Sequence, residues 1–293
     1  DATQILINQG PMAAYNFVDE SQVRALPFNE GDVDGAAIDF DNDGRVDLSL
    51  SRDKKYESNF QGEDQKAWFG LMHQQQDGTY ESVGVRSGIN TPDAVQQASL
   101  TDCDSAQPCT NPQEACLRDR CRIPCTSDSD CPQPHEMCHT GGFCKLKLTM
   151  KNAQNHAWSD YDRDGDLDVL IGGRDTGGGR PNFLFRNEVG QDNRWLAITL
   201  RGDGDTIQRD AFGARLEVQS AERLIVREVK SSRGMHNSLD TRTQVIGLGD
   251  LDCSYTVTVR WPNGERRTLE PEAILENHYM LLTYPAALEH DSR

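Results

Sequence analysis

The feature that most constrains this fold is an acidic stretch that occurs twice with the same spacing. Residues 39–47 read DFDNDGRVD and residues 160–168 read DYDRDGDLD; they are called the first loop and the second loop below. Both place aspartates at offsets 1, 3, 5 and 9 and a glycine at offset 6. Two carboxylates about 4 Å apart repel by roughly 4 kcal/mol at an effective dielectric near 20. The repetition therefore indicates a bound cation.

A loop with this spacing coils around one point, and the glycine permits the sharp turn. A divalent cation converts the repulsion into attraction, and flexible, all-oxygen ligation favours Ca²⁺ over zinc or copper. The alternative is a pair of acidic turns that only keep the surface soluble. The sequence predicts about two Ca²⁺ sites. The expected ligands are Asp39, Asp41, Asp43, the Arg45 carbonyl and Asp47, then Asp160, Asp162, Asp164, the Asp166 carbonyl and Asp168.

An alternating strand follows each loop, which sets the fold class. Val46, Leu48 and Leu50 alternate with polar residues after the first loop, and residues 167–171 continue the second in the same way. The unit is strand, acidic turn, strand, turn, strand, without the flanking helices of a helix-loop-helix calcium site. Such a unit must stack on copies of itself, as propeller blades do. The sequence thus predicts structural clasps between β-propeller blades.

The number of blades in this chain is too small for a closed propeller. Two units carry an acidic loop, and the opening segment ILINQG has the form of the trailing part of a third. A propeller needs at least four blades. We therefore expect the remaining blades either upstream of these residues or on a separate chain.

Eight of the nine cysteines lie in residues 103–144, which indicates a disulfide framework. This segment has too few large apolar side chains to offset the ordering of its backbone, so crosslinks must do so. Zinc binding is the alternative, but no CxxC knuckle occurs. Two similar spacings predict two modules, and first-to-third with second-to-fourth pairing is our hypothesis for each. The cysteines are Cys103, Cys109, Cys116 and Cys121, then Cys125, Cys131, Cys138 and Cys144. Cys253 is left over; we expect a buried thiol, with an intermolecular bridge as the alternative.

The C-terminal third is also predicted to be β. YTVTVRW at residues 255–261 alternates apolar and polar side chains, and Pro262, Asn263 and Gly264 then form a turn. WLAITL, RLEVQ, RLIVREV and YMLLTY supply further strands. A small β-sandwich-like domain accounts for these strands.

Two known families resemble these segments. GAAIDFDNDGRVDLSLS, HAWSDYDRDGDLDVLIGG and LFRN resemble the FG-GAP or VCBS-type repeats of integrin-like β-propellers, whose DxDxDG loops hold Ca²⁺. NRWLAITLRG, RDAFGARLEV, VIGLG and VTVRWPNGE resemble the ASPIC/UnbV domain that follows such repeats in secreted proteins such as cartilage acidic protein. One departure is residues 244–249, QVIGLG, where the family usually has HFGLG.

The resemblance implies a domain division for the chain. Residues 1–190 would be propeller blades, interrupted by the disulfide module at 103–144. Residues 191–286 would be the ASPIC/UnbV-like domain, and 287–293 a tail.

Charge and composition limit the partners. The formal net charge of −17 disfavours a nucleic-acid-binding surface, and no apolar run is long enough for a membrane span. There is no signal peptide or initiating Met, so we expect a processed or excised chain. Disulfides point to a secreted protein or a bacterial cell surface. We predict a Ca²⁺-stabilised protein that binds proteins or glycans.

Two further functions were weighed against binding. One is a subunit of an extracellular surface assembly, and the other is a metal-dependent extracellular enzyme. No general base stands beside the loops, so we expect no enzyme. The tripeptide Arg201-Gly202-Asp203 lies in a turn where those residues are expected anyway. The seven histidines lack metal-binding spacing and are expected to be packed or solvated.

Overall fold

The described part of the chain is built from β-strands. The computed structural model describes residues 3–26, 31–52, 69–84, 87, 89, 103–117, 120–132, 136–146, 150–175, 182–232, 239, 241–252, 254–285 and 287–290. Within these ranges the only helices are short 3-10 turns: η1 (Pro11–Ala13), η3 (Asp128–Asp130), η4 (Gly190–Asp192) and η6 (Pro271–Ala273). The predicted all-β class is therefore confirmed. No described helix combines the length and apolar character that crossing a bilayer requires.

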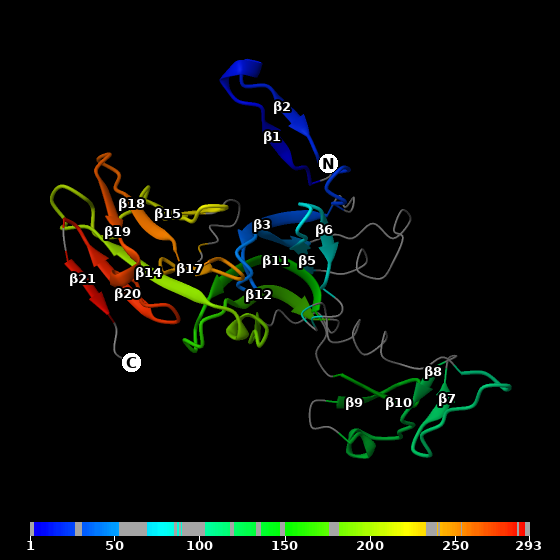
Figure 1. The fold of residues 1–293 in the computed structure, drawn as a ribbon. Coiled ribbons are helices and arrows are strands. Elements are labelled where there is room, and N and C mark those ends of the chain that lie inside the picture. The colour runs from blue at the N-terminus through cyan, green and yellow to red at the C-terminus, as the bar shows by residue number, and fades with distance from the viewer. Residues whose placement is uncertain are drawn as a thin grey trace.

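Two antiparallel sheets carry the acidic loops. One sheet has the order β3-β4-β5-β6, and the other has the order β11-β12-β13 (Figure 1). The first loop connects β3 to β4, and the second loop connects β11 to β12. The bounds are β3 (Asp32–Ile38), β4 (Asp47–Arg52), β5 (Phe69–Gln74), β6 (Tyr80–Ser82), β11 (Met150–Ser159), β12 (Asp168–Asp175) and β13 (Asn182–Phe185).

The two sheets share one apolar core, because β11 lies against β3 and β4. Ile38, Phe69, Leu71, Val169 and Ile171 are all buried in it. Burying such side chains stabilises the stack by about 1.5–3 kcal/mol each, counted against full exposure. The stacked sheets thus fix the positions of both loops.

A polar seam runs through this packing. His156 of β11 is 2% exposed, and its ring nitrogens lie 2.8 Å from Ser49 Oγ and 2.7 Å from Ser51 Oγ. The Trp158 indole N–H also donates to Ser49 Oγ at 2.9 Å. These bonds satisfy polar groups that would otherwise be costly to bury. His156 therefore has the packed role expected for it.

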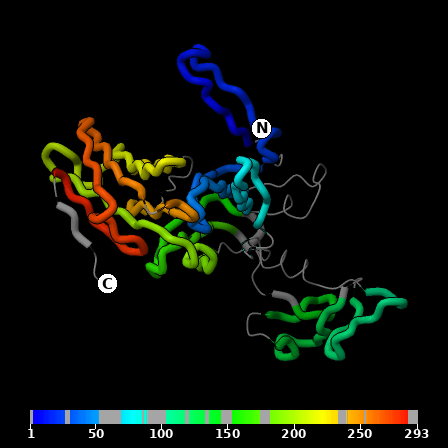
Figure 2. The backbone as a smooth tube through the Cα atoms, in the orientation of Figure 1, coloured from blue at the N-terminus to red at the C-terminus, as the bar shows by residue number. Residues whose placement is uncertain are grey.

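The N-terminal hairpin pairs β1 (Leu6–Asn8) with β2 (Phe17–Asp19). It extends away from the sheets (Figures 1 and 2) and leaves Met12 98% and Phe17 56% exposed. Among the described residues of 1–190, outside the Cys-rich segment, the sheets are these two stacked sheets and this hairpin, so a propeller stays a prediction.

The Cys-rich segment consists of two small hairpins. β7 (Ala115–Leu117) pairs with β8 (Arg120–Arg122), and β9 (Glu136–His139) pairs with β10 (Phe143–Leu146). Both modules show first-to-third and second-to-fourth pairing, as predicted. The four disulfides are Cys103–Cys116, Cys109–Cys121, Cys125–Cys138 and Cys131–Cys144. Cys253 lies outside the described residues.

Two four-stranded sheets form the C-terminal region, with orders β17-β14-β20-β21 and β16-β15-β18-β19. Their facing sides bury one apolar cluster that includes Leu216, Val257 and Ile246. The bounds are β14 (Trp195–Arg201), β15 (Arg215–Gln219), β16 (Leu224–Glu228), β17 (Gln244–Gly247), β18 (Thr256–Arg260), β19 (Arg266–Leu269), β20 (Tyr279–Thr283) and β21 (Ala287–His290). This arrangement is the predicted sandwich. Trp195, Ala197 and Val245 belong to the core of the loop-bearing sheets, so the regions pack together.

Candidate metal centres at the two acidic loops

The two loops have the same backbone conformation. Asn42 and Arg163, at offset 4, have positive φ values of 57° and 66°. Gly44 and Gly165, at offset 6, have φ values of 84° and 105°. Glycine adopts this region without strain, which explains the spacing of the sequence motif. The loops coil alike, as their repetition predicted.

The last aspartate of each loop secures it to the neighbouring strand. Asp47 accepts one backbone hydrogen bond from Phe40 at 3.2 Å and another from Gln74 at 2.8 Å, one on each carboxylate oxygen. Asp168 accepts the equivalent bonds in the second loop, from the backbone nitrogens of Tyr161 (3.1 Å) and Asn187 (2.8 Å). Asp47 and Asp168 therefore shape the loops whether or not they also bind metal.

The first aspartate of each loop has one satisfied oxygen and one unsatisfied oxygen. Asp39 Oδ2 accepts a 3.1 Å bond from Arg227, and Asp160 Oδ2 accepts one from the Tyr279 hydroxyl. The Oδ1 atoms of Asp39 and Asp160 are buried with no hydrogen-bond partner among the described residues. A buried unpaired carboxylate oxygen is costly, and a bound cation would satisfy it. The residues therefore fit a metal ion in both loops.

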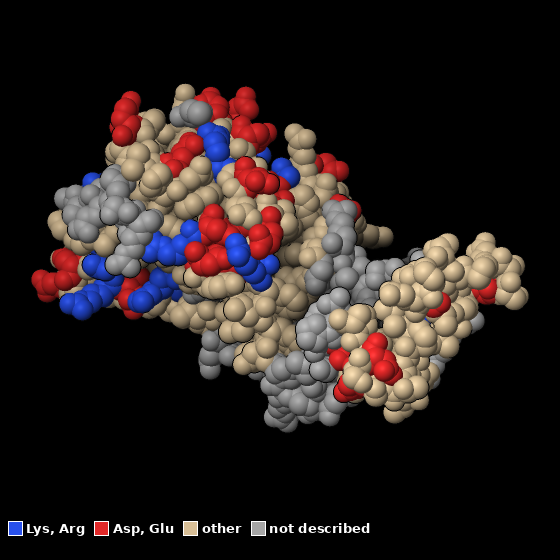
Figure 3. All heavy atoms as spheres, turned by 90° about the horizontal axis from the view of Figure 1, so that it is seen from below, with Lys and Arg blue, Asp and Glu red and all other residues tan. Residues whose placement is uncertain are grey.

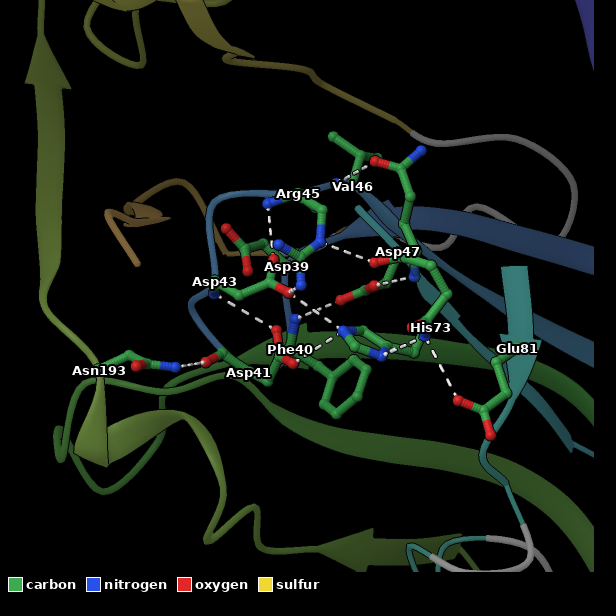
Figure 4. Close-up of polar contacts among 12 residues, drawn as sticks. Asp39, Phe40, Asp41, Asp43, Arg45, Val46, Asp47, His73, Glu81 and Asn193 are labelled. Atoms are coloured by element: carbon green, nitrogen blue, oxygen red, sulfur yellow. Dashed lines mark hydrogen bonds and ion pairs between the residues drawn. The ribbon is translucent and has the colours of Figure 1, made fainter. Parts of the chain in front are cut away.

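The middle aspartates each face a basic side chain. In the first loop, His73 Nε2 lies 3.1 Å from Asp41 Oδ2 and 3.1 Å from Asp43 Oδ2 (Figure 4). In the second loop, Arg186 Nε lies 2.8 Å from Asp162 Oδ2 and its Nη2 lies 3.2 Å from Asp164 Oδ2. The same position beside the carboxylates is thus filled by an imidazole in one loop and a guanidinium in the other.

The loops also differ at offset 7. The Arg45 guanidinium contacts Asp43 and donates from Nε to the Gln74 carbonyl at 2.8 Å. Asp166 in the second loop is buried, and its Oδ2 accepts a 3.1 Å bond from the Gly190 backbone nitrogen. Its Oδ1 has no partner in the described part of the chain. The sequence predicted a ligand role only for the carbonyls at these positions, so the Asp166 side chain was missed.

Burial raises the pKa of several of these carboxyl groups. The pKa of Asp39 rises to about 7, because removal from water outweighs the opposing attraction of Arg227. Burial raises that of Asp47 to about 9 and that of Asp166 to about 7, and Asp164 adds repulsion to the latter. Without a cation, burial therefore opposes the ionisation of all three groups.

At the two loops, three sets of described side chains could each hold an ion. Each residue of a set offers one ligand atom, and these atoms lie within 4.8 Å of one another. Two sets match the predicted sites in part, since Asp43 and Asp164 fall in neither. The sets are Asp39, Asp41 and Asp47; Asp160, Asp162 and Asp168; and Asp41, Asp43 and His73.

The two loops contact each other directly. The Asn42 side chain donates to the carbonyls of Gly165 at 2.8 Å and Gly190 at 3.1 Å. In return, the Asn187 side chain donates to the Phe40 carbonyl at 2.6 Å. A displacement of one loop therefore disturbs the other.

The C-terminal region packs onto the loops at close range. The Gly249 nitrogen donates to the Asn42 carbonyl at 3.0 Å, and Arg223 donates to the Asp43 carbonyl at 3.2 Å. A Cβ added at Gly247 or Gly249 would overlap the backbone of Asn42 or Asp43. The GLG sequence therefore permits the domain to reach the first loop. A Cβ at Gly165 would likewise overlap the Trp195 indole.

Comparison with known proteins bears on this packed region. Residues 204–289 match the family described as ASPIC and UnbV. The match begins after β14 and covers the residues Arg227, Gly249 and Tyr279, and it supports the predicted ASPIC/UnbV domain. No curated protein matches the chain. The resemblance of residues 1–190 to FG-GAP or VCBS repeats stays a prediction.

Several residues at the loops were missed by the sequence analysis. His73 was expected to be packed or solvated, yet it lies beside two predicted ligands. Alignment of FGLMHQ with NFLFRN places His73 and Arg186 at the same position after each loop, and that signal was available. Nothing in the sequence pattern marks Arg227 or Tyr279, because they lie far along the chain from the loops, in the region that matches the ASPIC and UnbV family.

Proposed function

We propose that this chain is an extracellular Ca²⁺-binding β protein that acts as a binding or adhesion module. Ca²⁺ in each acidic loop holds the stacked sheets together and holds them against the ASPIC and UnbV region. The remaining surfaces then contact proteins or glycans outside the cell.

One observation carries this proposal. Asp39 and Asp160 occupy equivalent positions, and each has a buried Oδ1 without a hydrogen-bond partner among the described residues. In both cases a residue of the ASPIC and UnbV region, Arg227 or Tyr279, holds the other oxygen. A cation on Oδ1 would therefore stabilise the loop and the contact between regions at once.

The chemistry of the second loop favours calcium. Asp160, Asp162 and Asp168 offer carboxylate oxygens close together, and Asp166 adds a buried carboxylate nearby. Hard oxygen ligands in a flexible loop suit Ca²⁺, which takes six to eight of them. Four disulfides are compatible with an oxidising compartment, and extracellular modules commonly bind Ca²⁺ weakly.

Binding is favoured over catalysis by how the loop carboxylates are used. Backbone nitrogens donate to both oxygens of Asp47 and of Asp168, so these carboxylates support the loop structure.

The surface charges also suit a binding role. On the face in Figure 3, acidic and basic side chains gather side by side. Surfaces with charges of both signs suit electrostatically matched partners.

A second candidate is a subunit of an extracellular assembly. The hairpin β1–β2 favours it, because Leu6, Met12, Tyr15 and Phe17 are each more than half exposed. Apolar side chains gathered on one exposed element mark interaction sites. Assembly and adhesion both require the folded, metal-bound sheets.

Thermal unfolding with Ca²⁺ and with a chelator tests the proposal. A ligand present at about 100 times its Kd stabilises by about 2.7 kcal/mol for each site. We expect the melting temperature to fall by about 10 °C on chelation. Asp39→Ala and Asp160→Ala should each lower the Ca²⁺-dependent shift, whereas Asp205→Ala, which removes an exposed aspartate outside the loops, should not. Equal melting temperatures with Ca²⁺ and with chelator would contradict the proposal.

A further inference from the structure

The first and second loops differ in the side chain that faces their middle aspartates. Met72 of β5 pairs with Leu48, and Phe185 of β13 pairs with Val169. His73 directly follows Met72, and Arg186 directly follows Phe185, so the two residues occupy equivalent positions. Only one of them has a lone pair that can bind a metal, since arginine stays protonated in proteins.

His73 points into the first loop from the neighbouring strand. Its side chain is 17% exposed, and its ring packs edge-on against Phe40 with centroids 5.9 Å apart (Figure 4). Nε2 lies 3.1 Å from an oxygen of Asp41 and from an oxygen of Asp43. Ligand atoms of an ion with bonds of about 2.0–2.2 Å and four to six ligands lie roughly 2.8–3.6 Å apart. Both distances from Nε2 thus match ligand spacing, and the three atoms lie within 4.8 Å of one another.

An independent observation points to a cation in the same loop. Asp41 belongs to the set with His73 and Asp43, and also to the set with Asp39 and Asp47. Asp39 is 1% exposed, and its Oδ1 has no hydrogen-bond partner among the described residues. The loop therefore offers a buried oxygen that lacks a partner, beside a nitrogen at ligand distance from two carboxylates.

We infer that the first loop binds a d-block dication such as Mn²⁺ through His73 Nε2 with the carboxylates of Asp41 and Asp43. The second loop, whose equivalent residue is Arg186, offers its cation oxygen ligands only. This inference rests on the proposed metal binding and adds a ligand class to it. Imidazole nitrogen suits d-block ions, whereas carboxylates suit Ca²⁺, Mg²⁺ and also Mn²⁺, so Mn²⁺ can report on the ligands of either loop.

The other ring nitrogen of His73 has a partner that can orient the ring. Gln75 Nε2 lies 3.0 Å from His73 Nδ1 and 3.3 Å from Glu81 Oε2. A half-turn of the Gln75 amide presents its oxygen to Nδ1, which then carries the proton and frees Nε2 for the metal. Metal-bound histidines commonly donate their second N–H in this way. Gln75 is thus a positioning residue.

Arg186 makes the second loop a matched control. Its side chain is 50% exposed and contacts Asp162, Asp164 and Glu188. It can swing into solvent when Ca²⁺ enters, but it supplies no ligand. Arg186→His would place an imidazole at the position equivalent to His73, and its exposure makes the change compatible with folding.

Pulsed electron paramagnetic resonance with Mn²⁺ tests the inference on the full, disulfide-bonded chain. One equivalent of Mn²⁺ should show ¹⁴N modulation from a coordinated imidazole. His73→Gln should abolish that modulation and weaken Mn²⁺ binding at least about tenfold, as expected for a lost ligand. Ca²⁺ affinity should change much less. His73→Arg, which copies the second loop, should act in the same way and serves if His73→Gln folds poorly.

The reciprocal variant completes the test. In the double variant His73→Gln/Arg186→His, the ¹⁴N modulation should return. Unchanged modulation in His73→Gln, or none in the wild type with Mn²⁺ bound, would overturn the inference and leave Ca²⁺ binding intact. Failure of both loops to bind Ca²⁺ would instead overturn the proposed function.

Discussion

The first and second loops have positive φ angles at the same positions but differ in the charges of their side chains. In the first, four carboxylates lie beside Arg45, Arg227 and His73. In the second, the position of Arg45 is taken by Asp166, and the facing cation is the half-exposed Arg186. The comparison teaches that the backbone fixes where an ion would sit. The side chains at offset 7 and on the next strand then set which ion it is and how strongly it binds.

The attachments of the two loops to the C-terminal region, residues 195–290, differ in kind as well. Hydrogen bonds and an ion pair from Gly249, Arg223 and Arg227 hold the first loop. The second loop is held by aromatic side chains, since Trp195 covers Gly165 and the Tyr279 hydroxyl binds Asp160. Changes to these contacts should therefore separate the two loops.

The largest loss of stability is expected from adding a side chain where the C-terminal region contacts the first loop. Gly249→Ala places a Cβ into the Asp43 backbone at a φ of +51°. Overpacking and left-handed strain together cost about 3 kcal/mol. Gly264→Ala is the matched control, because its φ is +92° and its added Cβ meets nothing within 4 Å. It should cost about 1 kcal/mol in chemical denaturation. Equal losses of unfolding free energy in the two variants would show that close contact at Gly249 is not needed for the C-terminal region to pack on the first loop.

The next effect is a pH dependence that metal reverses. Burial raises the pKa values of Asp39 and Asp166 to about 7, above about 3.9 in the unfolded chain. Below pH 7 the folded state therefore binds more protons than the unfolded state. From these two groups the chelated protein should gain about 3 kcal/mol as pH falls from 8 to 6, about 1.4 kcal/mol from each, and Asp47, whose pKa is about 9, adds to the gain.

With saturating Ca²⁺ this gain should vanish, because protons and the cation compete for the same carboxylates. Denaturant unfolding at both pH values, with chelator and with Ca²⁺, measures the difference. An apo protein that loses stability between pH 8 and 6 would contradict the burial of these groups.

Charge at offset 7 should tune Ca²⁺ affinity in opposite directions. Arg45→Asp gives the first loop the acid of the second and removes a cation that contacts Asp43, so its affinity should rise about tenfold. Asp166→Asn should weaken the second loop by a similar factor. Isothermal titration with Ca²⁺ measures both. Affinities that do not depend on offset 7 would mean that the two loops do not differ through charge.

The smallest effect is expected at the aromatic attachment. Tyr279→Phe keeps the ring that packs on Trp195 and removes the hydroxyl that binds Asp160. Loss of a hydrogen bond to a carboxylate costs about 1.5–3 kcal/mol at most, and bound Ca²⁺ offsets part of it. The Ca²⁺ affinity of the second loop should fall severalfold, with the first loop unchanged. An equal loss at both loops would point to general destabilisation.

The sequence pattern predicted the features that depend on residues close together in the chain. Alternation after each loop gave β4 and β12, and the doubled cysteine spacing gave the module and its pairing. The partners of the loops were not predictable in this way. Arg227 is 188 residues from Asp39, and Tyr279 is 119 from Asp160, so only the packing of the two regions brings them together. The Asp166 side chain was missed because the motif assigns that position to a carbonyl.

Native mass spectrometry after exchange into Ca²⁺ tests the central claim most directly. The wild-type chain should retain two Ca²⁺ ions, and Asp39→Ala and Asp160→Ala should each retain one. The double variant should retain none. A wild-type chain that carries no Ca²⁺, or single variants that still carry two ions, would contradict the assignment of both loops as metal centres.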